Sequence, residues 1–364
     1  MQLSSTLTWL IDAAAAAPGA DRFLAELGTR LILDGVPLAG GALTLTVPDP
    51  LIARRTWLWR ADTEVVIEAL AFASGELPGM GSAPPSGDAG RSWLAALGAG
   101  PVHQDIIGPA ADGPAFSWIG SRPLTPAQAG RLSEAARFSA APLAALSARA
   151  TLTAVLEAYL GRRSAARVMA GPIRRQVGET IRAALLFADL RGFTALSEAT
   201  PPAAVITALD AWFDCVAGSV HAFGGEVLKF IGDGVLAIFP VLGESPREAC
   251  DAALHAVSSA RAGVTHLNTE RRSQELPPLA FGAALHVGEI LWGNVGAADR
   301  LDFTAIGPAV NLVSRLEGLC RPLKRTILIS GAVAAEAAAP LIPLGMHELR
   351  GIASACAVYT VSDD

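Results

Sequence analysis

Two aspartates end two largely apolar segments in this 364-residue chain. Asp189 follows the segment 185–188, and Asp233 follows the segment 227–231 after one glycine. In both places another glycine lies within three residues, as expected where a strand ends in a tight turn. Carboxylate oxygens are the ligands that Mg²⁺ and Mn²⁺ prefer. The two segments therefore predict a divalent-metal site, provided that the fold brings the two aspartates together.

The elements around these aspartates predict that they meet. The apolar patterns predict, in chain order, a strand, a helix, a hairpin, a second helix and a last strand, at 182–188, 202–222, 226–239, 245–268 and 279–287. This βαββαβ order is that of a ferredoxin-like α+β fold. In that topology the end of the first strand lies beside the hairpin, which turns at 232–234. Asp189 and Asp233 should therefore face each other.

Three further side chains have spacings that suit such a site. Lys229 lies four residues before Asp233, and even spacing on one strand places both side chains on one face. Asn311 and Arg315 lie four residues apart on a helix predicted to begin near Pro308, so they share a helix face. Taken singly, each has a structural interpretation, since an Asp-Gly pair is a common hairpin turn and a strand lysine is commonly solvated.

The first half of the chain predicts a separate, smaller α+β domain. Helices are expected at 6–17 and 21–33, with Asp21 as the cap of the second, strands at 41–47, near 57–59, at 102–107 and at 115–119, and a loop at 74–90. A capping sequence at Thr125 predicts a helix that continues to about Tyr159 with a bend at Pro142. An apolar seam on this helix suits the pairing of two protomers. The seam consists of Ala148, Leu152, Val155 and Tyr159. This half resembles GAF-like sensor domains in the order of its elements, and a structural domain without a ligand fits the pattern equally well.

Composition argues against several function classes. The formal net charge of −6 gives no general electrostatic reason to bind nucleic acid. No stretch of about 18 residues stays apolar and uncharged, so no transmembrane segment is predicted. The N-terminus has no basic residue before its apolar run, and Asp12 interrupts that run, which is unlike a secretion signal. The four cysteines lack metal-ligand spacing, which favours reduced thiols in a cytoplasmic protein.

Four segments, in this order and at these separations, resemble the catalytic domain of class III nucleotidyl cyclases, the adenylyl and guanylyl cyclases. They are FADLRGFT, EVLKFIGDG, ALHVGEILWGNVG and RLDFTAIGPAVNLVSRLE. The resemblance extends from near Thr180 to the end of the chain. It implies a ferredoxin-like catalytic domain at 180–364. Together with the GAF-like order of elements in the first half, this predicts an N-terminal regulatory domain at 1–141 and a helical linker at 142–179.

The resemblance implies how the substrate triphosphate is held. Two Mg²⁺ or Mn²⁺ ions would occupy each active site, on two carboxylates and one backbone group, those of Asp189, Asp233 and Leu190. The triphosphate oxygens would accept hydrogen bonds from three backbone amides at a strand-to-helix turn, those of Gly192, Phe193 and Thr194. An acidic chain would then bind a polyanion through local donors and cations.

The resemblance also implies that ATP is the substrate and cyclic AMP the product. Lys229 favours adenine, because guanylyl cyclases typically carry an acidic residue there. Thr304 stands where a bacterial subgroup, class IIIb, has threonine or serine, and a hydroxyl can accept a hydrogen bond from the adenine amino group. Asn311 would bind the ribose, and Arg315 would stabilise the charge that develops on the α-phosphate.

One protomer of this family supplies the metal aspartates and the other the base and transition-state residues. Because all of these positions occur in one chain, the resemblance implies a homodimer with two shared active sites. The N-terminal half of the chain carries no motif that identifies a ligand. Alternatives are a guanylate or mixed-specificity cyclase and a non-catalytic nucleotide-binding or dimerisation module. A diguanylate cyclase is disfavoured because Val227, after the Gly-Gly-Glu triplet that ends at Glu226, stands where a second acid is needed.

Overall fold

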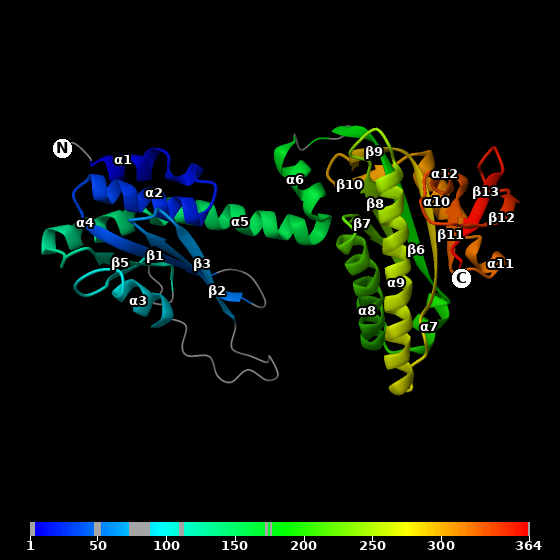
Figure 1. Cartoon of the computed structure of the whole chain (residues 1–364), viewed down its shortest axis with the longest axis horizontal. Coiled ribbons are helices and arrows are strands. Elements are labelled where there is room, and N and C mark those ends of the chain that lie inside the picture. Colours follow the sequence, from blue (N-terminus) through cyan, green and yellow to red (C-terminus); the bar gives the residue numbers. More distant parts are fainter. Residues whose placement is uncertain are drawn as a thin grey trace. The chain divides into compact units, whose positions relative to one another are not determined.

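Two compact units make up the chain, residues 1–154 and 155–364 (Figure 1). The structure is a computed structural model that describes residues 4–46, 52–72, 88–108, 113–171, 174 and 177–362. A five-stranded antiparallel sheet forms the centre of the first unit, in the order β3-β2-β1-β5-β4. Its strands are β1 Leu38–Thr46, β2 Ile52–Arg60, β3 Val66–Phe72, β4 His103–Ile106 and β5 Ala115–Gly120. The sequence predicts all of these except β3, whose residues do not alternate between apolar and polar.

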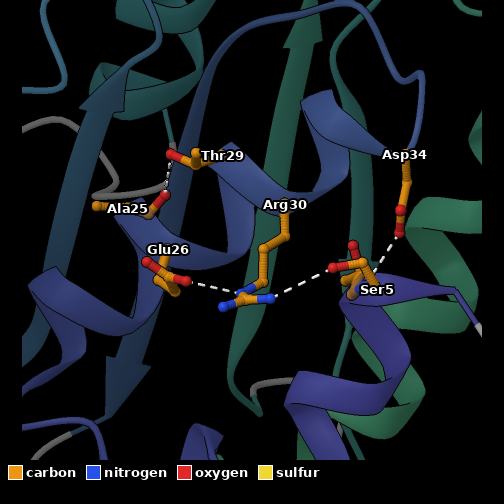
Figure 2. Close-up of polar contacts among 7 residues, drawn as sticks. Ser5, Ala25, Glu26, Thr29, Arg30 and Asp34 are labelled. Carbon is orange, nitrogen blue, oxygen red and sulfur yellow. Dashed lines mark hydrogen bonds and ion pairs between the residues drawn. The ribbon is translucent and has the colours of Figure 1, made fainter.

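The helices of the first unit pack on this sheet and on one another. They are α1 Ser5–Asp12, the short 3₁₀ helix η1 Ala14–Ala16, α2 Ala20–Leu33, α3 Asp88–Ala95 and α4 Pro126–Phe138. The apolar face of α2 is buried as predicted, at Phe23, Leu24, Leu27 and Leu31. The N-cap of α2 is Gly19 rather than the predicted Asp21, which lies in the first turn, where a carboxylate complements the helix dipole. Arg30 of α2 donates to Glu26 at 2.7 Å and to Ser5 of α1 at 3.3 Å (Figure 2).

The exit helix begins as predicted and is interrupted before its proline. The hydroxyl of Thr125 accepts from the N–H of Gln128 at 3.3 Å, and the side chain of Gln128 accepts from the N–H of Thr125 at 3.1 Å, which is the expected capping box. α4 ends there, and α5 Ala140–Leu160 follows after Ser139. Pro142 therefore lies in the first turn of α5, where its missing N–H costs little. Of the predicted loop 74–90, residues 74–87 lie outside the described residues and the last three begin α3.

The second unit contains an eight-stranded sheet in the order β12-β13-β11-β9-β6-β8-β7, with β10 paired to β9. Its strands are β6 Val177–Arg191, β7 Glu226–Ile231, β8 Gly234–Pro240, β9 Ala280–Gly296, β10 Leu301–Ile306, β11 Ile327–Ser330, β12 Ile342–His347 and β13 Cys356–Thr360. The order β9-β6-β8-β7 is the ferredoxin-like core that the sequence predicts. β6 and β9 are both longer than expected and pair along their whole shared length.

Side-chain alternation along β6 divides the core of the second unit into two layers. Its helices are α6 Arg162–Ala170, α7 Phe193–Ala199, α8 Pro202–Ala222, α9 Arg247–Ser273, α10 Pro308–Glu317, α11 Cys320–Leu323 and α12 Gly331–Ala334. Leu186 and Ala188 pack in the layer of α8 and α9, which lie side by side (Figure 1). Ala183 and Leu185 pack in the other layer, with α10. Asp189 continues this second series toward α10.

Two described helices, α5 and α8, are long and apolar enough to cross a membrane by length and composition alone. α8 buries Trp212 and Val216 in the core of the second unit. On α5 the seam residues Leu152, Val155 and Tyr159 are exposed. Pairing of two protomers through this seam stays a prediction.

Candidate active site

Asp189 and Asp233 meet at one end of the pair β6 and β8. Pairing of Ala188 with Val235 brings the end of β6 beside the turn that joins β7 to β8. The two carboxyl groups lie close enough to interact directly. Burial, followed by the contact with Asp233, raises the pKa of Asp189 from 3.8 to about 7. The prediction that the two aspartates face each other is confirmed.

The two carboxyl groups fit a divalent cation. Oδ1 of Asp189 is buried without a hydrogen-bond partner, which is costly unless a cation or a donor binds there. The indole N–H of Trp212 donates to the backbone carbonyl of Asp233 at 2.9 Å and holds the turn. Among the described residues, no group of three or more His, Cys, Asp or Glu side chains is arranged to hold a metal ion. The pair therefore suits a cation such as Mg²⁺ that takes phosphate and water as its other ligands.

A third carboxyl group, which the sequence does not predict, lies near this pair. Glu317, the last residue of α10, lies over Gly282, which pairs with Asp189 across β6 and β9. A Cβ atom on Gly282 would lie 2.3 Å from the Oε1 atom of Glu317. Burial raises the pKa of Glu317, with Arg191 opposing and Asp233 adding to the shift. Three carboxyl groups beside one guanidinium favour the binding of cations.

The strand-to-helix turn after Asp189 has the expected form. Gly192 has a φ of 74° and is the N-cap of α7, a conformation that glycine adopts at little cost. The N–H groups of Phe193 and Thr194 are in the first turn, where they lack partners within the helix and are suited to bind phosphate. The N–H of Leu190 donates to the Asp189 carboxyl group. The backbone of Leu190 as a metal ligand stays a prediction.

Lys229 does not share a strand face with Asp233, so the inference from even spacing was wrong. β7 ends at Ile231, and Asp233 lies in the turn before β8 begins at Gly234, so strand alternation does not extend from Lys229 to Asp233. Instead, the ammonium group of Lys229 forms an ion pair with the carboxylate of Asp302 on β10. Sequence reasoning missed this contact because it joins residues that are 73 positions apart.

Asp302 and Thr304 lie two residues apart on β10, so their side chains project from the same face of that strand. The side chain of Thr304 is buried. β10 pairs with β9, and Thr304 lies opposite Gly293. Asp302, the partner of Lys229, thus lies on the same strand and face as Thr304, the other residue expected to read the base.

Asn311 and Arg315 lie on the exposed side of α10, whose other side buries Val313 and Leu316. α10 begins at Pro308 as predicted. Among the described residues, neither Asn311 nor Arg315 has a side-chain hydrogen bond or an ion pair. The fold of one chain therefore brings Asp189 beside Asp233 and Lys229 beside β10. The side chains of Asn311 and Arg315 remain available to a ligand or to a second copy of the chain.

The sequence of the second unit matches a known family. Residues 176–341 match the family described as the adenylate and guanylate cyclase catalytic domain. These residues form a class III nucleotidyl cyclase domain. This agrees with the resemblance carried by the four sequence segments and with the ferredoxin-like order of the sheet.

Curated relatives and a solved structure are also similar to a part of the chain. An adenylate cyclase of Anabaena cylindrica is 35% identical over 165 residues, 44% of this chain and 32% of the relative. Adenylate cyclase 1 of Rhizobium meliloti is 34% identical over 181 residues, 48% of this chain and 27% of the relative. A bacterial light-regulated adenylyl cyclase structure is 28% identical with a TM-score of 0.51, and the match covers 60% of this chain and 62% of that one. The chain thus matches about a third of the length of the curated relatives.

The raised pKa of Asp189 predicts how pH and metal affect the stability of the cyclase domain. Without metal, this residue should lower the free energy of unfolding as pH rises from about 4 to about 7, because the unfolded chain loses the proton near 3.8 and the folded chain holds it to about 7. Mn²⁺ should restore the loss at neutral pH by replacing the proton. Urea unfolding between about pH 5 and 8, with and without Mn²⁺, measures both effects.

Asp189→Asn should remove both this pH dependence of the free energy of unfolding and its restoration by Mn²⁺. Asp214→Asn, which changes an exposed acid on α8, is the matched control and should behave as the wild type. If Asp189→Asn kept the wild-type dependence on pH and Mn²⁺, the assignment of Asp189 to the metal pair would be contradicted.

Proposed function

We propose that the chain is an adenylate cyclase that converts ATP to 3′,5′-cyclic AMP and pyrophosphate. The observation that carries the proposal is the contact between Asp189 and Asp233, with one buried carboxylate oxygen left without a partner. This pair suits cations that bind a triphosphate, and it lies within the cyclase domain. The reaction is attack of the ribose 3′-hydroxyl on the α-phosphate, with pyrophosphate as the leaving group.

In this proposal Asp189 and Asp233 hold two Mg²⁺ or Mn²⁺ ions, with the backbone of Leu190. When bound, these ions lower the pKa of the 3′-hydroxyl and neutralise the triphosphate. The backbone N–H groups of Gly192, Phe193 and Thr194 donate to phosphate oxygens at the start of α7. Because the domain is acidic around the pair, substrate binding should depend on these donors and on the cations.

Adenine selection is assigned to Lys229 and Thr304. An ammonium group donates to a ring nitrogen of adenine, whereas at the same edge of guanine the N–H would meet another donor. The hydroxyl of Thr304 accepts from the adenine amino group, and the ion pair with Asp302 orients Lys229. A hydroxyl both donates and accepts, so discrimination against GTP rests mainly on the lysine.

The active form is proposed to be a homodimer with two shared sites. Asn311 and Arg315 are exposed and unpaired among the described residues, as expected for groups that complete the site of a second copy. Asn311 binds the ribose, and Arg315 donates to the α-phosphate as its charge develops. Two-fold symmetry makes both sites equivalent.

The remaining regions are assigned regulatory roles in the cytoplasm. Residues 1–141 form a GAF-like regulatory domain whose ligand is unknown, 142–179 a linker and 180–364 the catalytic domain. The exposed seam on α5 supports pairing of linkers from two protomers.

Truncation of Arg315 tests its role in catalysis. The wild-type chain with ATP and Mn²⁺ or Mg²⁺ should produce cyclic AMP, and GTP should be a poorer substrate. Arg315→Ala should lower kcat by about 100-fold or more with little change in KM, because the lost contact forms only in the transition state. Cyclic nucleotide assays over a range of ATP concentrations measure both constants. A raised KM with an unchanged kcat would assign Arg315 to ground-state binding. Absence of cyclic AMP from the wild-type chain with either metal would refute the proposed cyclase activity.

Complementation tests the shared sites. Asp189→Ala and Arg315→Ala should each be nearly inactive alone. Mixed under conditions in which subunits exchange, they should regain up to about a quarter of the wild-type activity, since one of the two sites in a mixed dimer is intact and about half of the dimers are mixed. Mass spectrometry of differently labelled subunits verifies the exchange. Exchange without rescue would show that each site is built from one chain.

A further inference from the structure

The N-terminus of helix α6 is capped by a side chain from the sheet. The carboxylate of Glu226, the first residue of β7, accepts from the N–H of Arg163 at 3.1 Å and from the N–H of Ser164 at 2.9 Å. It also accepts from the hydroxyl of Ser164 at 2.7 Å. The helix N-cap, Gly161, supplies no side chain. Glu226 therefore provides from another element the acceptor that a capping residue normally supplies.

This contact, the Glu226 cap, is buried and specific. Glu226 is 4% exposed, and a buried carboxylate is tolerated only with donors to match it. Its donors are those of α6, whose dipole also favours a negative charge at this end. A Cβ atom on Gly161 would lie 3.0 Å from the Glu226 Oε1 atom, so a residue larger than glycine would be crowded there. The cap therefore fixes where α6 begins on the sheet.

The last turn of α6 is held on the same side of the domain. The guanidinium group of Arg167 lies 4.5 Å from the centre of the Trp292 ring on β9, a favourable cation–π distance. Arg167 also pairs with Glu179 of β6 at 2.6 Å. Val168 packs on the apolar layer that includes Leu228 of β7. α6 is thus held to β7 at its start, by Glu226, and to β9 in its last turn, by the contact of Arg167 with Trp292.

The two strands that hold α6 also position the residues assigned to the base. Lys229 follows Glu226 by three residues on β7, with the irregular pairing between them. Trp292 pairs with Ala305 of β10, next to Thr304. A displacement of α6 would therefore disturb the backbone beside both Lys229 and Thr304.

We propose that α6, held by the Glu226 cap, positions the base-binding pair Lys229 and Thr304, and that the docking of α6 sets affinity and selectivity for the nucleotide base. This inference rests on the proposed function, since it assigns control of the same site. Glu226 is a positioning residue that acts through Lys229. Because α6 follows α5 directly in the chain, a change in α5 that pulled on Gly161 would weaken base binding.

Two substitutions in the 364-residue chain test the proposal. Glu226→Gln keeps the shape of the side chain and replaces one acceptor by a donor, while Ser164→Ala removes only the hydroxyl donor. The matched control is Glu270→Gln on α9, an exposed glutamate that forms an ion pair with His266 one turn away. For each variant, hydrogen exchange of residues 163–170 reports the docking of α6. KM, kcat and the dissociation constants for ATP and GTP report base binding.

Glu226→Gln should speed hydrogen exchange in α6 and raise the KM and the dissociation constant for ATP roughly fivefold to tenfold, the factor that one lost hydrogen bond gives. kcat at saturating ATP should change less than about twofold, and the preference for ATP over GTP should fall. Ser164→Ala should act in the same direction with a smaller effect, and Glu270→Gln should match the wild type.

Faster exchange in α6 with unchanged ATP affinity and base preference would overturn the proposal, because the cap would then be structural only. Weaker ATP binding without faster exchange would overturn it as well. Absence of cyclic nucleotide from the wild-type chain would refute the proposed function. Even for an inactive chain, the dissociation constants of ATP and GTP for the wild type and Glu226→Gln would still test whether α6 controls base binding.

Discussion

Contact between two carboxyl groups is the constraint on which the cyclase domain depends, because Asp189 and Asp233 repel each other whenever both are ionised. Neither segment would hold this arrangement alone. The register of β6 against both β8 and β9 fixes Asp189, and the hydrogen bond from buried Trp212 fixes the turn that carries Asp233. Apolar layers on both faces of the sheet supply the free energy that keeps the pair together. The packing that folds the domain thus holds two carboxylates that repel each other, and this repulsion favours the binding of cations between them.

The charge around this pair determines how an acidic chain binds a polyanion. Glu317 adds a third carboxyl group, and Arg191 compensates it only in part. A triphosphate approaching such a site without cations would be repelled, whereas cations held by the pair reverse the sign of the local field. The net charge of −6 is therefore compatible with ATP as substrate, since attraction is confined to one sheet edge and the start of one short helix.

Sequence reasoning succeeded where local pattern decides structure and failed where long-range contacts do. The strand before Asp189, the hairpin turn at Asp233 and the helix start at Pro308 follow from apolar periodicity, glycine and proline. The shared face of Lys229 and Asp233 does not, because β7 ends at Ile231 and Asp233 lies in the turn beyond it, where strand alternation no longer applies. Asp302 was missed for a related reason, since its partner lies on a strand distant in the sequence. The four-segment resemblance predicted the family without requiring any of these contacts.

β7 and the turn after it carry three residues with different roles, and the irregular pairing of β7 separates the first two. Glu226 caps α6, Lys229 pairs with Asp302, and the turn that follows carries Asp233. In a regular strand, residues three apart project from opposite faces, so the direction of Lys229 would follow from that of Glu226 alone. Because the pairing shifts between them, the direction of Lys229 is set locally, by the backbone just after Glu226. A helix that holds that backbone is therefore well placed to change the direction of Lys229 without moving the two aspartates.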